Sequence, residues 1–492
     1  MQKILVANRG EIALRVMRSA KEMNIKTVAV FSEADRAMPF VQYADEAVCI
    51  GPAASSASYL NMDKIISAAR QTGADAIHPG YGFLSENAAF SKAVSDAGLT
   101  FIGPSAHSIE VMGSKIAAKQ AAKQFNVPMV PGTDKPITDE AEALDIAQKA
   151  GYPVLIKASA GGGGKGMRVV EKAGDMGEQL HRAKSEALNA FGNDDVFIEK
   201  YVAAPRHIEI QLLGDQHGNY VYLFERECSI QRRHQKLIEE APSSCLTPAI
   251  RRKMGESAIN VARSCKYYGA GTVEFLVDEQ LNFYFLEMNT RLQVEHCVTE
   301  MISGVDLVKE QIRVAMGEKL SFSQDDLKIN GHAIELRVCT EDPLDNFLPD
   351  TGRLDVYRRP QGPGIRVDDG YEQGMDIPIF YDSMIAKLVA WGKDRNEAID
   401  RLCRGIDEYQ VEGIKTTLAF GKWAVRQPAF AEGKFDTGFI GKYFKPECLA
   451  VHDETAEKAA AGIGSYIWES QKKADNHQPA NASISKWKLQ RQ

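Results

Sequence analysis

The sequence lacks several features that would direct it to particular classes of protein. Its eight cysteines include no CxxC pair and no spacing typical of a metal site, which favours reduced thiols over a disulfide framework. A net charge of -7, without a basic stripe carrying interleaved aromatic residues, gives no electrostatic case for nucleic acid binding. No apolar run is long enough to cross a bilayer, and the first, Ile4–Ala7, is too short for a signal peptide. We therefore expect a cytoplasmic protein that binds neither nucleic acid nor membrane.

A dinucleotide fingerprint is also missing. The first turn from strand to helix reads Asn8-Arg9-Gly10-Glu11 rather than GxGxxG, so a nicotinamide cofactor is not supported. The surrounding residues nevertheless alternate short apolar runs with helical patterns, the rhythm of a parallel doubly wound sheet. The strands expected in residues 1–113 are Lys3–Ala7, Thr27–Phe31, Ala76–His78 and Thr100–Ile102, and the helices are Glu11–Met23, Ile65–Thr72 and Glu86–Ala97.

Length and changes of pattern indicate several domains. A chain of 492 residues is too long for one hydrophobic core. After residues 1–113, a helix at Ser114–Phe125 and a proline-rich linker lead into a small unit that ends near residue 201. Residues 202–446 read as an α+β unit, and the tail 447–492 holds an amphipathic helix, roughly Glu454–Glu469. The elements expected in the two middle parts are Val154–Ala158, Met167–Val170, Gly177–Ala190, Val196–Glu199, His207–Leu213, Tyr220–Arg226, Pro248–Cys265, Gly304–Met316, His332–Val338, Met384–Trp391 and Asn396–Glu408.

Two strand patterns, Gly271–Val277 and Asn282–Asn289, flank a short turn and predict a hairpin. Folding brings Glu274 close to Glu287, and Asn289 shares a face with Glu287. Facing carboxylates repel unless a cation lies between them, and two carboxylates with an amide oxygen suit Mg²⁺ or Mn²⁺. An edge hairpin with a solvated acidic face is the alternative interpretation.

A glycine-rich loop joins two of the expected strands. Its glycines are Gly161, Gly162, Gly163, Gly164 and Gly166. Consecutive glycines cost backbone entropy, and a chain keeps them where N–H groups approach a ligand closely, most often phosphate. Lys157 precedes the loop and Lys165 lies within it, but Met167 and a strand follow, so the match to a P-loop fails. The loop is predicted to be a flap over phosphate, with a flexible surface hairpin as the alternative.

Polar residues elsewhere suit an anion site. His207 and the basic run Cys228–Lys236 suit the oxygens of a triphosphate, although a solvated basic loop would be the better explanation without the glycine loop and the acid pair. Two arginines, Arg291 and Arg337, would offer a bidentate anion site beside a candidate base, Glu295. Taken singly, these residues are equally well explained by surface ion pairs.

Long stretches of residues 1–446 follow the pattern of one family. They read ILVANRGEIA, HPGYGFLSEN, KASAGGGGKGM, EKY, PRHIEIQ, ECSIQRRHQKLIEEAP, EMNTRLQVEH, FYDSMIAKL and GIKTTL. In them the chain resembles the biotin carboxylase component of biotin-dependent carboxylases, an ATP-grasp enzyme. The resemblance implies an α/β and α+β protein with a Rossmann-like N-terminal domain at 1–113. A helical linker with an ATP-grasp lid would follow at 114–201, and a C-terminal ATP-grasp domain at 202–446.

The resemblance also implies roles for individual residues. Those that would bind ATP are Lys115, Lys157, the five loop glycines, Glu199, Lys200, Val202, His207, Gln231, His234, Lys236, Glu274 and Glu287. The metal site would use Glu274, Glu287 and Asn289. Arg291, Gln293 and Val294 would cradle bicarbonate. Glu295 would be the catalytic base, Arg337 would stabilise the biotin enolate, and Arg291 would act with them.

The implied reaction is the ATP-dependent carboxylation of biotin, the first half-reaction of an acyl-CoA or pyruvate carboxylase. It would use bicarbonate through carboxyphosphate, with two Mg²⁺ or Mn²⁺ ions beside ATP, and yield ADP and phosphate. Because the sequence holds no AMKM-type biotinylation site, biotin would arrive on a separate carrier protein. The other implied partners are a second copy of the chain, in a homodimer, and a carboxyltransferase subunit. The tail 447–492 departs from the family pattern, because its simplest members end near residue 446.

Two other functions stay open on the sequence alone. Another ATP-grasp ligase would join a carboxylate to an amine through an acyl phosphate, and a nucleotide-sensing scaffold would bind ATP without turnover. ATP cleavage that depends on bicarbonate and is stimulated by biotin separates both from a biotin carboxylase. Acetyl-CoA (in fatty acid biosynthesis), propionyl-CoA and pyruvate are all open as the final carboxyl acceptor.

Overall fold

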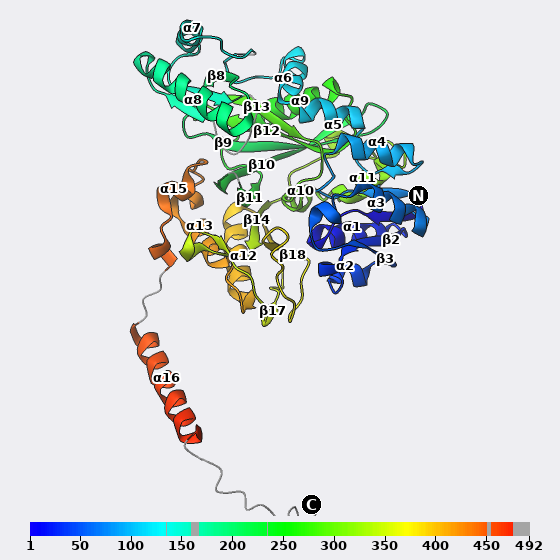
Figure 1. The fold of residues 1–492 in the computed structure, drawn as a ribbon, viewed down its shortest axis with the longest axis vertical. Coiled ribbons are helices and arrows are strands. Elements are labelled where there is room, and N and C mark those ends of the chain that lie inside the picture. Colours follow the sequence, from blue (N-terminus) through cyan, green and yellow to red (C-terminus); the bar gives the residue numbers. More distant parts are fainter. Residues whose placement is uncertain (134, 159–166, 234, 450–453, 476–492) are drawn as a thin grey trace, which may run out of the picture. The chain divides into compact units, whose positions relative to one another are not determined.

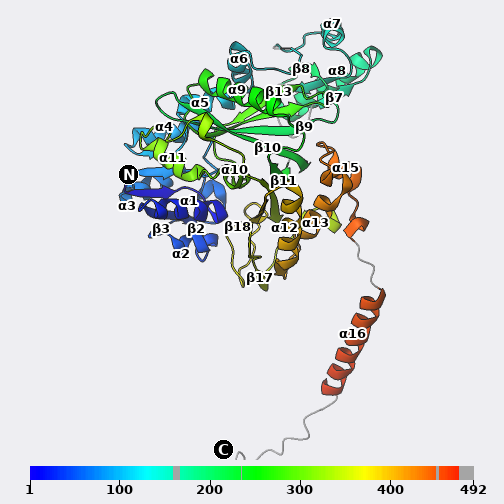
Figure 2. The ribbon, with the colours of Figure 1, turned by 180° about the vertical axis from the view of Figure 1, so that it is seen from behind.

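The computed structural model describes residues 1–133, 135–158, 167–233, 235–449 and 454–475. The chain divides into two compact units, Met1–Lys445 and Pro446–Gln492. Three sheets of three or more strands lie in the first unit (Figures 1 and 2). Two small sheets complete it, β15 (Glu341–Asp342) with β16 (Leu348–Pro349), and β17 (Val356–Arg358) with β20 (Gln410–Glu412).

The N-terminal sheet is wholly parallel, in the order β3-β2-β1-β4-β5, which confirms the predicted class. Its elements are β1 (Lys3–Val6), α1 (Gly10–Glu22), β2 (Lys26–Ser32), α2 (Pro39–Tyr43), β3 (Glu46–Gly51), α3 (Met62–Thr72), β4 (Ala76–His78), α4 (Ala88–Asp96), β5 (Thr100–Phe101) and α5 (Ala106–Gly113). In the central strand β1, Ile4, Leu5 and Val6 form an apolar run, as expected of a strand buried on both faces. The edge strand β3 escapes sequence prediction, since half of its residues are exposed and its charged start hides the pattern.

An eight-stranded antiparallel sheet occupies the middle of the first unit, in the order β13-β12-β9-β10-β11-β14-β19-β18 (Figure 1). Its strands are β9 (Arg206–Gly214), β10 (Tyr220–Arg232), β11 (Gln235–Ala241), β12 (Gly269–Val277), β13 (Phe283–Asn289), β14 (His332–Cys339), β18 (Ile365–Asp369) and β19 (Met384–Gly392). Ile208 and Ile210 of β9 and Val273 and Phe275 of β12 share a hydrophobic core with α9. The residues between them are polar and point to the opposite face, which therefore carries the site.

The helices around this sheet come mostly from its connections. They are α9 (Pro248–Ser264), α10 (His296–Ser303), α11 (Leu307–Ala315), α12 (Arg395–Glu408), α13 (Leu418–Arg426), α14 (Pro428–Ala431) and α15 (Phe439–Tyr443). Helices α9, α11 and α12 confirm the predicted ones to within three residues at either end.

The basic run Cys228–Lys236 is not the solvated loop that its composition allows. Strand β10 continues well beyond the predicted end at Arg226, and β11 follows it, so that Gln231 pairs with Lys236 inside the sheet. The sequence prediction ended the strand too early because polar and basic residues predominate there. Arg232 donates to Asn346, and Lys236 is paired with acids on neighbouring strands, contacts that no local pattern shows.

A three-stranded antiparallel sheet, β7-β6-β8, lies with α7 (Glu140–Ala150) and α8 (Met176–Phe191) at the top of Figure 1. Its strands β6 (Val154–Ala158), β7 (Met167–Val170) and β8 (Val196–Lys200) share a hydrophobic core with the two helices. Helix α6 (Lys115–Gln124) precedes them, and its predicted N-cap is confirmed, since Ser114 Oγ accepts from the Ala117 N–H at 3.3 Å. The predicted phosphate flap, residues 161–166, lies outside the described residues.

Among its described residues the second unit contains one α-helix, α16 (Glu454–Asp475), and a short 3-10 helix at Pro446–Leu449. Helix α16 confirms the predicted tail helix but ends six residues later than expected, because the sequence after Glu469 contains good helix formers. Ile463, Tyr466, Ile467 and Trp468 give it an exposed apolar surface. In the part of the chain that the structure describes, no helix combines the length and hydropathy needed to span a membrane.

Candidate active site

The site is built on the polar face of the large sheet, where acidic residues on neighbouring strands are in register. Glu274 of β12 pairs with Glu209 of β9 on one side and with Glu287 of β13 on the other. The hairpin prediction that Glu274 faces Glu287 is therefore confirmed. Glu274 is buried, whereas Glu287 is exposed on the edge strand. Such a row of carboxylates requires compensating cations or a metal ion.

Lys236 supplies the central compensating charge. Its Nζ lies 2.6 Å from Glu209, 3.0 Å from Glu274 and 2.8 Å from Glu295. Burial alone would raise the pKa of Glu274. Lys236, and then His207 with its Nε2 3.1 Å from the carboxylate, outweigh burial and hold that pKa well below its ordinary value. Lys236 and His207, both predicted to bind ATP, thus contact Glu274, which is predicted to bind the metal ion.

Glu295 lies between two cations. Its Oε1 accepts from Lys236, and its Oε2 accepts from the guanidinium of Arg337 at 2.9 Å. Burial works to raise the pKa of Glu295, but Lys236, Arg337 and Arg226 together hold it well below its ordinary value. Arg337 also donates its Nε–H to Glu239 at 2.6 Å, and burial raises the pKa of Glu239 to about 7 despite that contact. Glu295 is therefore ionised and firmly held.

Arg226 is a site residue that the sequence analysis missed. It is fully buried and donates to Glu209, to Gln211 at 2.6 Å and to Gln293 at 3.0 Å. It thereby links two strands of the sheet to the segment predicted to bind bicarbonate. The one sequence signal is an arginine at an inward position of an apolar strand, since a buried arginine needs several acceptors.

The segment 291–295 departs in one respect from expectation. The prediction places two arginines beside Glu295, but Arg291 donates to Glu86 at 2.8 Å and to Asn289 Oδ1 at 3.1 Å. Lys236, not Arg291, is the second cation on Glu295. The physical reason is Glu86, which lies in the loop before α4 and offers Arg291 a nearer carboxylate. Gln293 donates to Glu274 at 3.1 Å, so this predicted bicarbonate residue touches the metal-site acid.

Three predicted nucleotide-binding residues lie on the small sheet. Glu199 of β8 accepts hydrogen bonds from Lys157 of β6 and from Lys119 of α6. Burial works to raise the pKa of Glu199, and these two lysines lower it below its ordinary value. Lys200 instead donates to the carbonyl of Gly151 at 2.7 Å. Of the three predicted residues, Lys157 and Glu199 therefore meet and Lys200 does not join them.

Lys119 was missed from sequence although a signal was present. It lies four residues after the predicted Lys115, and residues at that spacing share one face of a helix. The side chain of Lys115 and all of His234 lie outside the described residues, as does the glycine loop. Val202 follows β8 and is half-buried, and Gln231 lies on β10 as the register partner of Lys236.

The donors of the predicted metal site fit a magnesium ion. Glu274, Glu287 and Asn289 offer oxygen atoms, which hard divalent cations prefer. Thr272 and Asn289 pair across the hairpin two residues along from the two acids, and Asn289 Nδ2 lies 2.9 Å from Glu274. Lys236 and His207 lie beside Glu274, so this position is one at which positive charge is stabilised.

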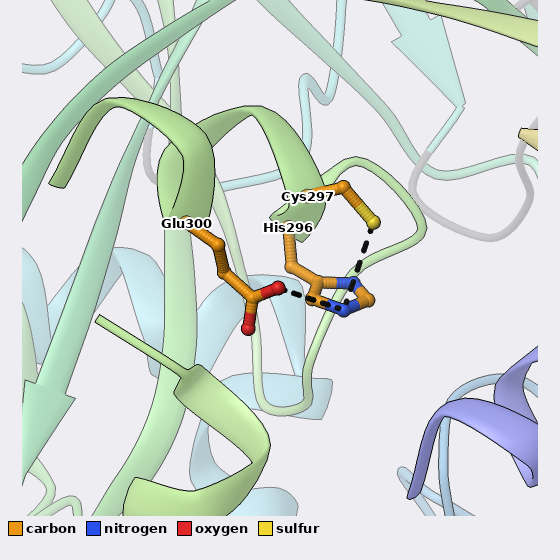
Figure 3. Close-up of side chains that lie close together, drawn as sticks. All are labelled: His296, Cys297 and Glu300. Carbon is orange, nitrogen blue, oxygen red and sulfur yellow. Dashed lines mark hydrogen bonds and ion pairs between the residues drawn. The ribbon is translucent and has the colours of Figure 1, made fainter. Parts of the chain in front are cut away.

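A second cluster of ligand types does not fit a metal ion. His296, Cys297 and Glu300 lie together on α10 (Figure 3). Glu300, however, accepts hydrogen bonds from Arg15 and from Arg366, each at 2.8 Å. Burial, and the positive charges nearby, push the pKa of His296 well below its ordinary value. A divalent cation would be repelled by those same charges, so the cluster is a structural network.

Comparison with known proteins shows which protein family the chain resembles. Residues 1–109 match the family described as biotin carboxylase, N-terminal domain, and residues 335–442 match the biotin carboxylase C-terminal domain. Residues 114–323 match the ATP binding domain of the carbamoyl-phosphate synthase L chain. Biotin carboxylase 1 of Bacillus subtilis is 50% identical over 444 residues, which are 90% of this chain and 99% of that protein. The chain belongs to the biotin carboxylase family.

Other members support the same assignment. The biotin carboxylase of a Nostoc species is 51% identical over 438 residues, which are 89% of this chain and 98% of that protein. The biotin carboxylase domain dimer of Hydrogenobacter thermophilus 2-oxoglutarate carboxylase, solved with MgADP, ADP and bicarbonate, is 46% identical. Its TM-score is 0.83 over 92% of this chain and 99% of that one. The predicted fold and family are confirmed, and the reaction of this biotin carboxylase is the ATP-dependent carboxylation of biotin.

Proposed function

We propose that this biotin carboxylase uses ATP and bicarbonate to carboxylate biotin held on a separate carrier protein. The observation that carries the proposal is the position of Glu295, in contact with both Lys236 and Arg337. The carboxylate of Glu295, which can accept a proton, thus lies beside Lys236, which is suited to bind the phosphates of ATP, and beside Arg337, which is suited to stabilise an oxyanion. The relative solved with MgADP and bicarbonate supports both ligands. The division of the chain at residues 113, 201 and 446 belongs to the same proposal.

Glu295 removes the proton of bicarbonate in this proposal, and Arg291, Gln293 and Val294 hold the anion. A low pKa makes Glu295 a weak base while both of its cations remain in contact. Phosphate oxygens of ATP compete with Glu295 for Lys236. When Lys236 moves from Glu295 to the phosphates, the pKa of Glu295 rises, so Glu295 becomes a stronger base only in the presence of the nucleotide. Bicarbonate then attacks the γ-phosphate of ATP, ADP leaves as the bond to the β-phosphate breaks, and carboxyphosphate forms.

Glu274, Glu287 and Asn289 hold Mg²⁺ in this proposal, with Mn²⁺ as a substitute. The ions, two beside ATP, neutralise charge on the phosphates when bound. The remaining ATP contacts come from the predicted set, with Lys157 and Glu199 on the small sheet. Because Glu199 is shared by Lys157 and Lys119, both lysines are kept near the nucleotide side of the site.

Arg337 faces the enolate oxygen of biotin in this proposal. Its guanidinium is already oriented by Glu239 at 2.6 Å and Glu295 at 2.9 Å, and a preorganised donor is typically worth about 3 kcal/mol of barrier. The phosphate released with CO₂ from carboxyphosphate takes the N1′ proton of biotin. The relative solved as a biotin carboxylase domain dimer supports a homodimer. A carboxyltransferase subunit in the cytoplasm would use the product, with acetyl-CoA, propionyl-CoA or pyruvate as acceptor.

The test is the dependence of ATP cleavage on bicarbonate and free biotin. The wild-type enzyme is expected to require bicarbonate and to be stimulated by biotin. E295Q and R337M are expected to lose about 100-fold or more of the biotin-dependent rate while binding ATP normally. R395M is the matched control, because it breaks a buried ion pair with Glu240 in which neither residue belongs to the proposed site. A wild-type rate indifferent to both substrates refutes the function. Weak ATP binding with normal turnover in E295Q refutes the role of Glu295.

A further inference from the structure

Lys387 is a buried lysine outside the proposed catalytic set. It lies on β19, with Arg337 of β14 and Asp368 of β18 as its register partners. Its side chain has no exposed surface, and its Nζ lies 3.2 Å from Glu11 of α1 and 4.0 Å from Asp368. The same Nζ donates a hydrogen bond to the backbone carbonyl of Val294 at 3.0 Å. Lys387 therefore connects helix α1 and the large sheet to the segment predicted to bind bicarbonate.

The backbone carbonyl of Val294 accepts a hydrogen bond from a different kind of donor than the carbonyls next to it in the chain do. The carbonyls on either side, those of Gln293 and Glu295, accept from backbone amides in the first turn of α10. Within the described part of the chain no backbone amide donates to the carbonyl of Val294. The ammonium of Lys387 takes that place. It thereby fixes the plane of the peptide that links Val294 to Glu295.

A lysine at this position would lower the stability of the protein if packing were its only role. Burying an ammonium costs several kcal/mol unless it is paired, and an apolar side chain of similar length would avoid that cost. The acidic neighbours Glu11 and Asp368 offset the charge. An ammonium has three N–H donors, so pairing with acids leaves one for Val294.

We propose that Lys387 is a positioning residue for the carboxylation reaction, acting through the Val294 carbonyl to orient both the bicarbonate segment and the base Glu295. The inference rests on the proposed function, because it takes residues 291–295 to be the bicarbonate site. Loss of Lys387 then impairs the use of bicarbonate selectively. A lysine that served only as the ion-pair partner of Glu11 would affect stability without that selectivity.

The experiment compares the wild type with K387M, E11Q/K387M and R395M. The double variant removes both charges, so a folding defect caused by an unpaired Glu11 is relieved. Both Lys387 variants are expected to raise the KM for bicarbonate about tenfold or more, the loss of one charged hydrogen bond, with the KM for ATP changed less than about twofold. R395M also removes a cation that bonds a buried acid and a backbone carbonyl, that of Ala431, and is expected to keep both KM values.

Amide hydrogen exchange supplies a second measurement that needs no activity. The amide of Val298 bonds to the carbonyl of Glu295, and its protection is expected to fall in E11Q/K387M but not in R395M. A wild-type enzyme without bicarbonate-dependent activity refutes the proposed function, and exchange still tests the positioning by Lys387. Unchanged exchange together with a wild-type KM for bicarbonate in E11Q/K387M overturns the inference alone.

Discussion

The Nζ of Lys236 lies 2.8 Å from Oε1 of Glu295. The same ammonium lies 3.0 Å from Glu274, so a single cation joins the proposed metal-binding acid to the proposed base. A nucleotide that draws Lys236 toward its phosphates acts on both carboxylates at once. Binding of ATP and activation of the base are thereby coupled through one side chain.

Replacing Lys236 with glutamine is expected to weaken ATP use and to change the pH dependence of the remaining activity. The charge of Lys236 lowers the pKa of Glu295, so its removal raises that pKa. The base acts when ionised, and the acidic limb of the pH profile of kcat/KM therefore moves to higher pH in K236Q. Steady-state ATP cleavage between about pH 5 and 9 measures the limb. A limb that stays at the wild-type position would contradict the coupling.

Replacing Arg226 with methionine is expected to destabilise the protein. The change removes five hydrogen bonds and leaves the buried carboxylate of Glu209 with Lys236 at 2.6 Å and the ring of His207 at 3.9 Å. Breaking a buried ion pair costs about 3–5 kcal/mol, and the remaining lysine points to the lower end of that range. Urea unfolding measures the loss. E209Q/R226M is the control, and recovers part of the stability if the unpaired charge is the cause. No recovery would assign the loss to packing instead.

Replacing Lys119 with methionine is expected to raise the KM for ATP and to leave the KM for bicarbonate unchanged. Lys119 shares Glu199 with Lys157, so its loss lets the carboxylate pull Lys157 away from a nucleotide. Its side chain is 38% exposed, which limits the expected change to about three- to fivefold. K92M, which removes an exposed lysine paired with Asp96, is the matched control. An equal rise for both substrates would show that Lys119 does not act through the nucleotide.

The parts of the site predicted from sequence are those that local pattern determines. Glu274 faces Glu287 because a tight turn sets the register of two adjacent strands with clear alternation. The parallel N-terminal sheet could equally be predicted from the sequence, since its central strands are mainly apolar. The roles assigned to individual residues by family resemblance stay predictions that the mutants above test.

The parts that the sequence did not reveal depend on contacts between distant residues. Arg226 bonds Gln293, which is 67 positions away, and Lys119 bonds Glu199, which is 80 positions away. No window along the chain contains both partners, so the position of each cation in the sequence does not show which groups it contacts. The end of β10 and the start of β11 were misjudged for the same reason, because Asn346, which accepts from Arg232, and the acids that pair with Lys236 lie elsewhere in the sequence.

Glu11 predicts a dependence of stability on pH that glutamine should abolish. Burial raises the pKa of Glu11 to about 7, and the opposing charge of Lys387 only partly offsets this effect. The folded protein therefore binds a proton that the unfolded chain has released between about pH 4.5 and 7. A raised pKa contributes stability below the unfolded value, and that contribution is lost as pH rises through the folded value. The total over this window is on the order of 3 kcal/mol.

Glutamine resembles protonated Glu11 at every pH, so the contribution of this position becomes constant in E11Q. Urea unfolding of wild type and E11Q at about pH 4.5 and pH 8 measures the change, because all other titrating groups are common to both proteins. The free energy of unfolding of E11Q is expected to gain relative to wild type as pH rises. A relative gain as pH falls would mean that Lys387 lowers the pKa of Glu11 below its unfolded value. In that case the ion pair, and not burial, would dominate the link between α1 and β19.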